Sequence, residues 1–190
     1  MESRDSASLR TLGVFGEDIC ISIEKLSKKN EEIVRGFSCG NDEIDEFFRN
    51  KALHSINEVT YLFIDDDRKC LAAAASLACS SIPVSSAGRC CASIPCVEIT
   101  YFAVNTAYQR LYTSADPDDL YFSDSVLCSV IRIIHDISDN YCGASHILLY
   151  STEAGKNLYE RQGFVEIPEG NYIIRDGSYT EGCTPMMFPL

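Results

Sequence analysis

The sequence predicts an α/β protein of the α+β kind, with a mixed, mostly antiparallel sheet flanked by helices. Several short segments alternate apolar with polar residues or are rich in β-branched residues, as strands are. Other segments repeat apolar residues at the spacing of a helix, and the two kinds are interleaved along the chain. The chain has 190 residues, of which 46% are hydrophobic and 23% charged. This composition is typical of a folded globular protein and excludes a wholly disordered chain.

The amino-terminal residues differ in character from the rest. Residues 1–18 are polar and mix acids with bases, so we expect a mobile tail there. No internal repeat or composition shift divides residues 19–190, which we expect to form a single domain. The first strand is predicted where apolar residues alternate, at Ile19, Ile21 and Ile23.

A turn cluster, Phe37-Ser38-Cys39-Gly40-Asn41, leads into the first predicted helix. Asn41 is a favourable N-cap residue, and acidic residues follow it in the first turn, where they suit the helix dipole. Apolar residues then recur at helical spacing, which predicts an amphipathic helix whose buried face consists of Ile44, Phe47, Phe48, Ala52 and Ile56.

The middle of the chain is predicted to be mostly strand. Residues 59–64 and 70–82 flank the acidic turn Asp65-Asp66-Asp67, which indicates a hairpin. Residues 80–95 are rich in Ser, Pro, Ala and Cys, and we expect a loop there. Residues 97–104 include β-branched and aromatic residues on both faces, which is typical of a central, buried strand.

The remaining elements are two helices and three strands. Ser123 is predicted to cap a helix that extends to about Ser138, and residues 147–150 form a strand. A short helix over 153–162 is closed by Gly163, a residue suited to a left-handed C-terminal position. Residues 164–167 and 185–188 are predicted to be the last strands.

The net charge of the chain indicates which classes of binding partner are favoured. Sixteen basic and 28 acidic residues give a net charge of −12 and a pI near 4.6. Such acidity disfavours broad binding to nucleic acid or anionic membranes and favours a cationic or neutral partner. No stretch of about 20 apolar residues and no secretory leader are evident, so we expect a cytoplasmic protein. The ten cysteines form no C-x-x-C pair, which argues against a metal site, and we expect most of them to be small core residues.

Three stretches resemble the GNAT acetyltransferase superfamily. Residues 101–109, Tyr-Phe-Ala-Val-Asn-Thr-Ala-Tyr-Gln, are similar to the end of its central strand. Residues 158–164, Leu-Tyr-Glu-Arg-Gln-Gly-Phe, resemble its late helix-to-strand motif, and residues 37–47 are similar to the first helix of the branch that includes toxin-type acetyltransferases. The likeness covers about residues 19–190 and implies a GNAT fold with acetyl-CoA as co-substrate.

The resemblance also implies roles for particular residues. The backbone N–H groups of Phe102, Ala103 and Val104 would hold the pantetheine and polarise the thioester carbonyl. Tyr159 would be the general acid that protonates the leaving thiolate. Glu98, on the central strand, is a candidate proton acceptor, since apolar surroundings would raise the pKa of its carboxyl. Each role has a structural alternative. The strand at 102–104 is then only a buried strand, and Tyr159 only packs its ring. Glu98 is then a structural carboxylate, and a water chain accepts the proton in its place.

The phosphate-binding loop departs from the family pattern. The family follows its central strand with Q/R-x-x-G-x-G/A; here Gln109 matches, but Tyr112 and Ser114 replace the glycines. Arg110 and the helix that starts near Ser123 are the remaining candidates to bind phosphates. Three interpretations stay open: a remodelled loop that binds CoA, a weakened site, or a lost one.

The leading hypothesis is an N-acetyltransferase in which a primary amine, on a small cationic molecule or a protein, attacks acetyl-CoA directly in a ternary complex. A toxin that acts on charged tRNA is less favoured because of the acidity. The alternative is a non-catalytic binding or regulatory module with a lost CoA loop. A cysteine-based hydrolase or redox protein is a more distant third. No metal is expected, and a homodimer is left open.

Overall fold

The computed structural model describes residues 9–12, 18–86, 89–112, 121–168 and 181–190. The chain divides into two compact units. Unit 1 comprises Met1–Ser76 and Tyr101–Leu127, and unit 2 comprises Leu77–Thr100 and Cys128–Leu190. Two strands and a helix contribute residues to both units, and the single domain expected from the sequence stays a prediction.

Unit 1 contains strands in the order β1, β2, β3, β4, β5. Their bounds are β1 Leu9–Leu12, β2 Asp18–Lys25, β3 Glu58–Asp65, β4 Cys70–Ser86 and β5 Arg89–Val104. The pairs β1–β2 and β2–β3 are antiparallel. The prediction of a tail over residues 1–18 is therefore wrong for residues 9–12, which pair with β2, and for Asp18, which begins it. A strand of four residues is too short for a pattern of apolar and polar residues to reveal it in the sequence.

The predicted first helix begins as expected. The Asn41 side chain accepts hydrogen bonds from the N–H groups of Glu43 (3.1 Å) and Ile44 (3.2 Å), which confirms Asn41 as N-cap. The helix then changes its winding, from α1 (Asp42–Glu46) to the π-turn η3 (Phe47–Lys51) and the 3₁₀ turn η4 (Ala52–His54). It ends before Ile56, whose side chain is 92% exposed, so the prediction that Ile56 is buried is wrong.

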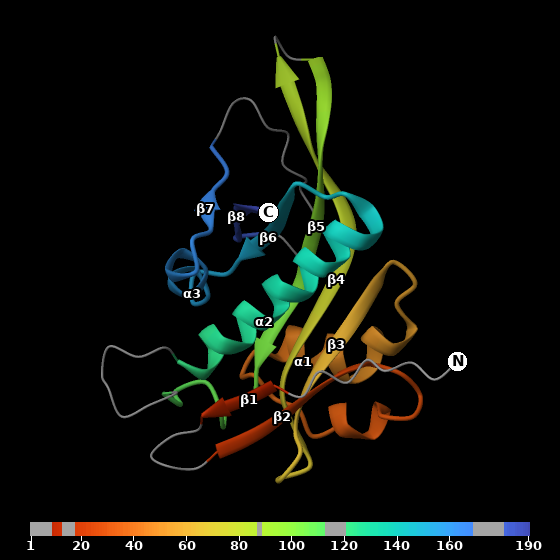
Figure 1. The fold of residues 1–190 in the computed structure, drawn as a ribbon, viewed down its shortest axis with the longest axis vertical. Helices are drawn as coiled ribbons and strands as arrows, with labels where there is room; N and C mark the ends of the chain where they lie inside the picture. The colour runs from red at the N-terminus through yellow and green to blue at the C-terminus, as the bar shows by residue number, and fades with distance from the viewer. Residues whose placement is uncertain (1–8, 13–17, 87–88, 113–120, 169–180) are drawn as a thin grey trace. The chain divides into compact units, whose positions relative to one another are not determined.

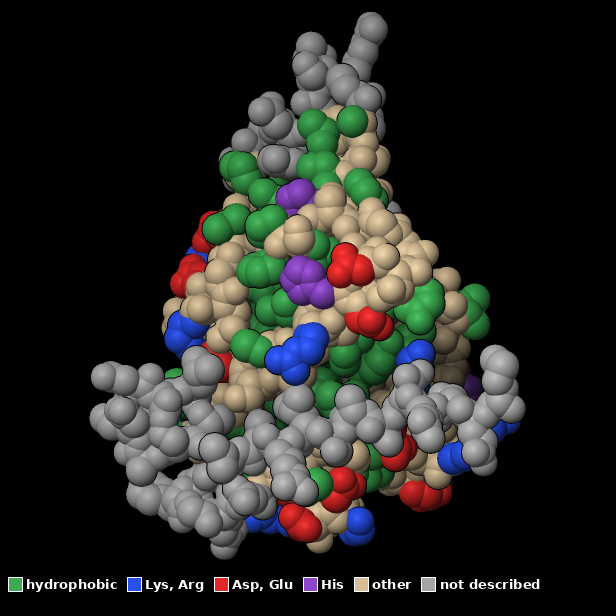
Figure 2. All heavy atoms as spheres, viewed as in Figure 1, with side chains coloured by type: hydrophobic (Ala, Val, Ile, Leu, Met, Phe, Trp, Pro, Cys, Tyr) green, Lys and Arg blue, Asp and Glu red, His purple; other side chains and the backbone are tan. Residues whose placement is uncertain are grey.

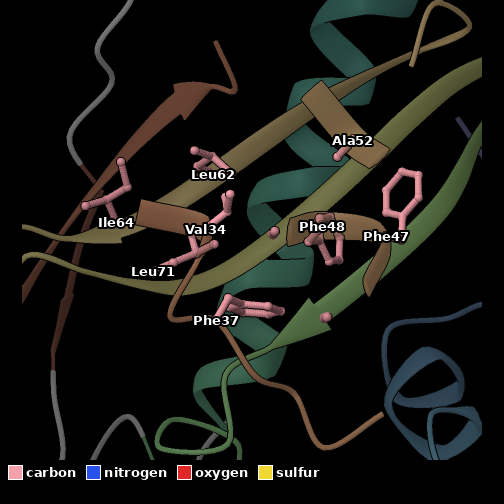
Figure 3. Close-up of a cluster of buried hydrophobic side chains, with 10 residues drawn as sticks. Val34, Phe37, Phe47, Phe48, Ala52, Leu62, Ile64 and Leu71 are labelled. Carbon is pink, nitrogen blue, oxygen red and sulfur yellow. The ribbon is translucent and has the colours of Figure 1, made fainter. Parts of the chain in front are cut away.

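The core of unit 1 lies where this helical segment packs on the strands. Figure 3 shows aromatic side chains from η3 and the preceding loop beside aliphatic side chains from β3 and β4. The rings of Phe37 and Phe48 meet edge to face with centroids 5.6 Å apart, and the ring of Phe47 stacks on that of Tyr101 at 3.7 Å. The remaining buried members are Val34, which ends the 3₁₀ turn η2 (Glu31–Val34), together with Ala52, Leu62, Ile64, Leu71, Ala74 and Ala103.

Unit 2 contains strands in the order β4, β5, β6, β8, β7. β6 spans His146–Ser151, β7 spans Val165–Glu166 and β8 spans Thr184–Pro189. β5 and β6 are parallel, whereas β6–β8 and β7–β8 are antiparallel. The mixed, mostly antiparallel sheet predicted from the sequence is therefore confirmed.

Three helical elements complete the described structure. α2 spans Phe122–Ile137, the π-turn η5 spans Ser138–Cys142 and α3 spans Lys156–Arg161. At the end of α3 the N–H of Phe164 donates to the Tyr159 carbonyl and the N–H of Gly163 to that of Glu160, each at 3.0 Å. With φ of +89° at Gly163, this is the Schellman arrangement, and the predicted role of Gly163 is confirmed.

Two further sequence predictions are wrong. The loop predicted over residues 80–95 is wrong for residues 80–86 and 89–95, which belong to the long strands β4 and β5 that Figure 1 shows; residues 87–88 lie outside the described residues. Of the eight cysteines whose side chains the structure describes, only Cys96 is buried, so the prediction that most cysteines fill the core does not hold for these eight. None of the helices in the described residues is long and apolar enough to cross a membrane.

Candidate functional site

The end of β5 is the first feature of the candidate site. Ala103 and Val104 are buried, at 5% and 6% exposure. The N–H of Asn105, just after β5, donates to the Ala72 carbonyl of β4 at 2.8 Å. Because N–H groups alternate in direction along an extended chain, the N–H of Ala103 also points toward β4, whereas those of Phe102 and Val104 point to the opposite edge.

Hydrogen bonds on several sides hold residues 105–111, here called the exit segment. The Asn105 side chain donates to the Leu71 carbonyl (3.0 Å) and accepts from the Ala107 N–H (3.1 Å). The Thr106 N–H donates to the Ser38 carbonyl at 2.9 Å. The turn cluster that resembles toxin-type acetyltransferases thus contacts the end of the central strand.

Gln109 connects the same elements through its side chain. Its amide nitrogen donates to the carbonyls of Cys39 (2.7 Å) and Val104 (2.9 Å). An amide NH₂ group has two hydrogens, so both are used here. In this arrangement Gln109 can offer a phosphate only its backbone N–H.

Backbone donors are nevertheless available beside it. Among the described residues, the N–H groups of Gln109 and Arg110 donate to no acceptor, and both side chains are exposed. The Arg110 guanidinium forms no ion pair within that part of the chain. Neighbouring backbone N–H groups beside a guanidinium are a suitable arrangement for a phosphate.

Ser123 lies inside α2 and does not cap it, because the helix begins at Phe122. The prediction of Ser123 as N-cap is therefore wrong by two residues, because the N-cap position is Tyr121. Instead, the carboxylate of buried Asp124 accepts the Tyr121 N–H at 3.1 Å, as the third residue of a capping box does. The Ser123 N–H has no acceptor among the described residues, but the nearby carboxylate offsets part of the positive helix end.

The two predicted acid–base residues lie in unit 2. Glu98 is 3% exposed on β5, opposite Leu148 of β6. Tyr159 is 8% exposed on α3, and its ring contacts that of Phe164 edge to face at 5.7 Å. Burial raises the pKa of the Tyr159 phenol, with the nearby Cys183 adding to the shift. Tyr159 is therefore protonated at neutral pH and can act as a neutral donor.

Pairing between β5 and β6 covers only a short stretch. The ladder runs from Cys96–His146 to Ile99–Leu149. β6 continues to Ser151 and stays paired with β8 as far as Thr184. The part of β5 that pairs with β6 thus ends at Ile99, three residues before Phe102, the first residue that the resemblance assigns to the thioester.

Two buried carboxylates were missed by the sequence analysis. Asp65 is fully buried and accepts the Tyr108 hydroxyl at 2.6 Å, while Asp45 accepts the Ser38 hydroxyl at 2.8 Å and the Cys39 N–H at 2.7 Å. Burial alone would raise the pKa of each, but the hydrogen bonds and a nearby arginine outweigh it and lower both pKa values. The only sequence signal was an Asp-rich turn, which is also typical of plain surface turns. Among the described residues no group of three His, Cys, Asp or Glu could hold a metal ion.

Comparison with known proteins identifies the fold. No family model and no curated protein matches the sequence. Among solved structures, one described as a bacterial toxin matches with a TM-score of 0.67 and 20% identity, over 90% of this chain and 91% of its own. A tyrosine-to-phenylalanine variant of KacT matches with a TM-score of 0.64 and 15% identity, over 89% of this chain and 94% of its own. AtaT with acetyl-methionyl-tRNAfMet matches with a TM-score of 0.62 and 14% identity, over 89% of this chain and 94% of its own. The chain has the GNAT fold of these toxin-type acetyltransferases.

The neighbours correct one expectation. They include a complex with DNA, a complex with an antitoxin and the complex with an acylated tRNA. Our prediction that the acidity disfavours nucleic acid is not borne out by them. Net charge is a sum over the molecule, and Figure 2 shows Lys and Arg side chains among the acidic ones on the visible face. A chain of charge −12 can still present local cationic surface.

Proposed function

We propose that this protein is an acetyl-CoA-dependent N-acetyltransferase. The observation that carries the proposal is the pair of backbone N–H groups at Gln109 and Arg110, which have no acceptor among the described residues. They follow the central strand of a chain with a GNAT fold, where the resemblance implies the pyrophosphate of CoA. They supply the donors for which other members of the family use a glycine-rich loop.

The backbone at the end of β5 would bind the thioester. The alternation fixed by the Asn105–Ala72 hydrogen bond favours Phe102 and Val104 for this role and disfavours Ala103, whose N–H points toward β4. A backbone N–H aimed at the carbonyl oxygen stabilises the negative charge that develops there during attack. This assignment refines the three residues that the resemblance implied.

The reaction needs two proton transfers. The amine nitrogen forms a bond to the acetyl carbon, the carbon–sulfur bond breaks, and CoA leaves as a thiolate. Tyr159 would protonate that thiolate, because its phenol is a neutral O–H donor at pH 7. The proton lost by the amine would pass to Glu98, directly or through water, because Glu98 is a buried carboxylate on the central strand.

The acceptor that we propose is a primary amine, and one neighbour supports a particular class of it. One of them is AtaT bound to acetyl-methionyl-tRNAfMet, in which the acetylated group is an aminoacyl residue on tRNA. That complex supports aminoacyl-tRNA as an acceptor for this chain. Small polyamines and protein lysines remain the acceptors that a net charge of −12 favours. Parallel assays with the three acceptor classes distinguish them.

Calorimetry with acetyl-CoA tests the proposal, and we expect submillimolar binding. Replacing Tyr159 by Phe removes only the hydroxyl, so turnover should fall while acetyl-CoA binding is kept. Tyr141→Phe is the matched control, since the Tyr141 ring is 80% exposed and the same change there should leave turnover unaltered. Unchanged turnover in Tyr159→Phe would refute the acid role.

A second candidate function is a non-catalytic binding or regulatory module. The observation that favours it is Tyr112, which replaces a glycine of the family motif and pairs with Tyr121 in an isolated bridge, with the two rings 4.8 Å apart. Such a bulky pair leaves less room for a pyrophosphate than glycines do. No binding at millimolar acetyl-CoA would favour this function over the enzyme.

A further inference from the structure

Tyr108 joins three segments of unit 1 that are far apart in the sequence. Its hydroxyl donates to Asp65, the last residue of β3, at 2.6 Å, and the sulfur of Cys70, the first residue of β4, lies 3.2 Å from the same oxygen. Its ring packs against that of Phe122, the first residue of α2, with centroids 5.3 Å apart. Tyr108 itself belongs to the exit segment and is only 3% exposed.

Asp65 is in turn firmly held. One carboxylate oxygen accepts the N–H groups of Asp67 (3.0 Å) and Arg68 (2.8 Å). The other accepts the Tyr108 hydroxyl and pairs with the Arg68 guanidinium at 3.1 Å. The same guanidinium lies 6.0 Å from the centre of the Tyr108 ring. A hydrogen bond to a carboxylate that several donors already fix is strong and directional.

This arrangement adds a side-chain restraint to the backbone hydrogen bond that the Phe122 N–H donates to the Leu111 carbonyl at 2.8 Å. Gln109 and Arg110 follow Tyr108 directly in the chain. They carry the backbone N–H groups that the proposed function assigns to the pyrophosphate. Phe122, against which Tyr108 packs, precedes Ser123 in the first turn of α2. Tyr108 therefore fixes the exit segment and the start of α2 with respect to each other.

We propose that the Asp65–Tyr108 hydrogen bond positions the exit segment and the start of α2 to bind the pyrophosphate of acetyl-CoA. Tyr108 and Asp65 are positioning residues, since they act through the N–H groups of Gln109 and Arg110. This inference rests on the proposed function. It explains how a phosphate-binding segment without the family's glycines keeps its donors in place.

The test compares two ligands by calorimetry. Acetyl-CoA carries the pyrophosphate, and S-acetylpantetheine carries the same thioester without it. In Tyr108→Phe, which keeps the ring and loses the hydroxyl, we expect the Kd of acetyl-CoA to rise about tenfold, the effect of one charge-assisted hydrogen bond. The Kd of S-acetylpantetheine should not change. The control Tyr141→Phe should match the wild type with both ligands.

The outcomes separate the two proposals. Wild-type affinity for acetyl-CoA in Tyr108→Phe, or an equal loss for both ligands, overturns the positioning role and leaves the proposed function intact. Absence of acetyl-CoA binding by the wild type overturns the proposed function and this inference with it. If Tyr108→Phe does not fold, Arg68→Gln replaces it, because the Arg68 side chain is 52% exposed. There a rise of about threefold, again confined to acetyl-CoA, is expected, and an unchanged Kd overturns the inference.

Discussion

Asp45 offers the sharpest test of how the turn cluster supports the end of β5. Its carboxylate is 2% exposed and accepts the Ser38 hydroxyl and the Cys39 N–H, and the Arg49 guanidinium lies 3.5 Å away. Asp45→Ala leaves these donors without their acceptor. A buried donor without an acceptor costs roughly 1–3 kcal/mol, so we expect a loss of about 2–4 kcal/mol in the free energy of unfolding at pH 7. Urea titration measures it.

The control and the pH dependence make the test specific. Asp42→Ala changes an exposed acid of the same helix and should cost at most about 1 kcal/mol. The folded pKa of Asp45 is lowered, so its stabilisation is complete above the unfolded pKa and is lost as the pH falls through the folded one. The gap between wild type and Asp45→Ala should therefore narrow below about pH 4. Equal free energies of unfolding of Asp45→Ala and Asp42→Ala at pH 7 would contradict the role of Asp45. A difference between wild type and Asp45→Ala that does not change with pH would contradict it as well.

Three other substitutions test the fold. Gly163→Ala places a Cβ atom 3.4 Å from the Phe188 ring on a residue with φ of +89°. It should lower the free energy of unfolding, measured in urea, by about 1–2 kcal/mol. Gly36→Ala is the control and should be nearly neutral, because no atom of a described residue beyond its chain neighbours lies within 4 Å of the added Cβ. Asn41→Ala removes the N-cap and should cost about 1 kcal/mol; an unchanged midpoint would contradict the cap. Phe48→Ala should cost about 3–5 kcal/mol because the ring is 1% exposed, and a loss below about 1 kcal/mol would show that the cluster in Figure 3 is not a packed core.

Local chemistry explains which elements the sequence could predict. Asn41 and Gly163 were identified correctly because a cap and a left-handed terminus depend on a few neighbouring residues. Residues 80–95 were misassigned because Ser, Ala and Pro have low strand propensity and only pairing along a long hairpin makes them extended. Ile56 was misplaced because the helical segment ends at His54 with Ser55 extended, so the helical spacing does not reach Ile56.

The candidate site, too, could be predicted from the sequence only in part. The motif around Gln109 and Arg110 suggested a phosphate-binding segment, which stays a prediction. The hydrogen bond from Gln109 to Cys39 joins residues 70 positions apart and leaves no local pattern. The bond between Tyr108 and Asp65 spans 43 positions and is equally invisible in the sequence. Residue spacing can therefore suggest which residues carry the chemistry, whereas the groups that position them come only from the tertiary structure.

Transfer of a labelled acetyl group tests the central claim most directly. Purified protein is incubated with acetyl-CoA labelled in the acetyl carbonyl and with aminoacyl-tRNA, a polyamine or a lysine peptide in separate reactions. The account predicts label in an amide on one of these amines, with an equal amount of free CoA thiol released. Binding of acetyl-CoA without transfer to any of them would contradict the N-acetyltransferase and favour a module that only binds.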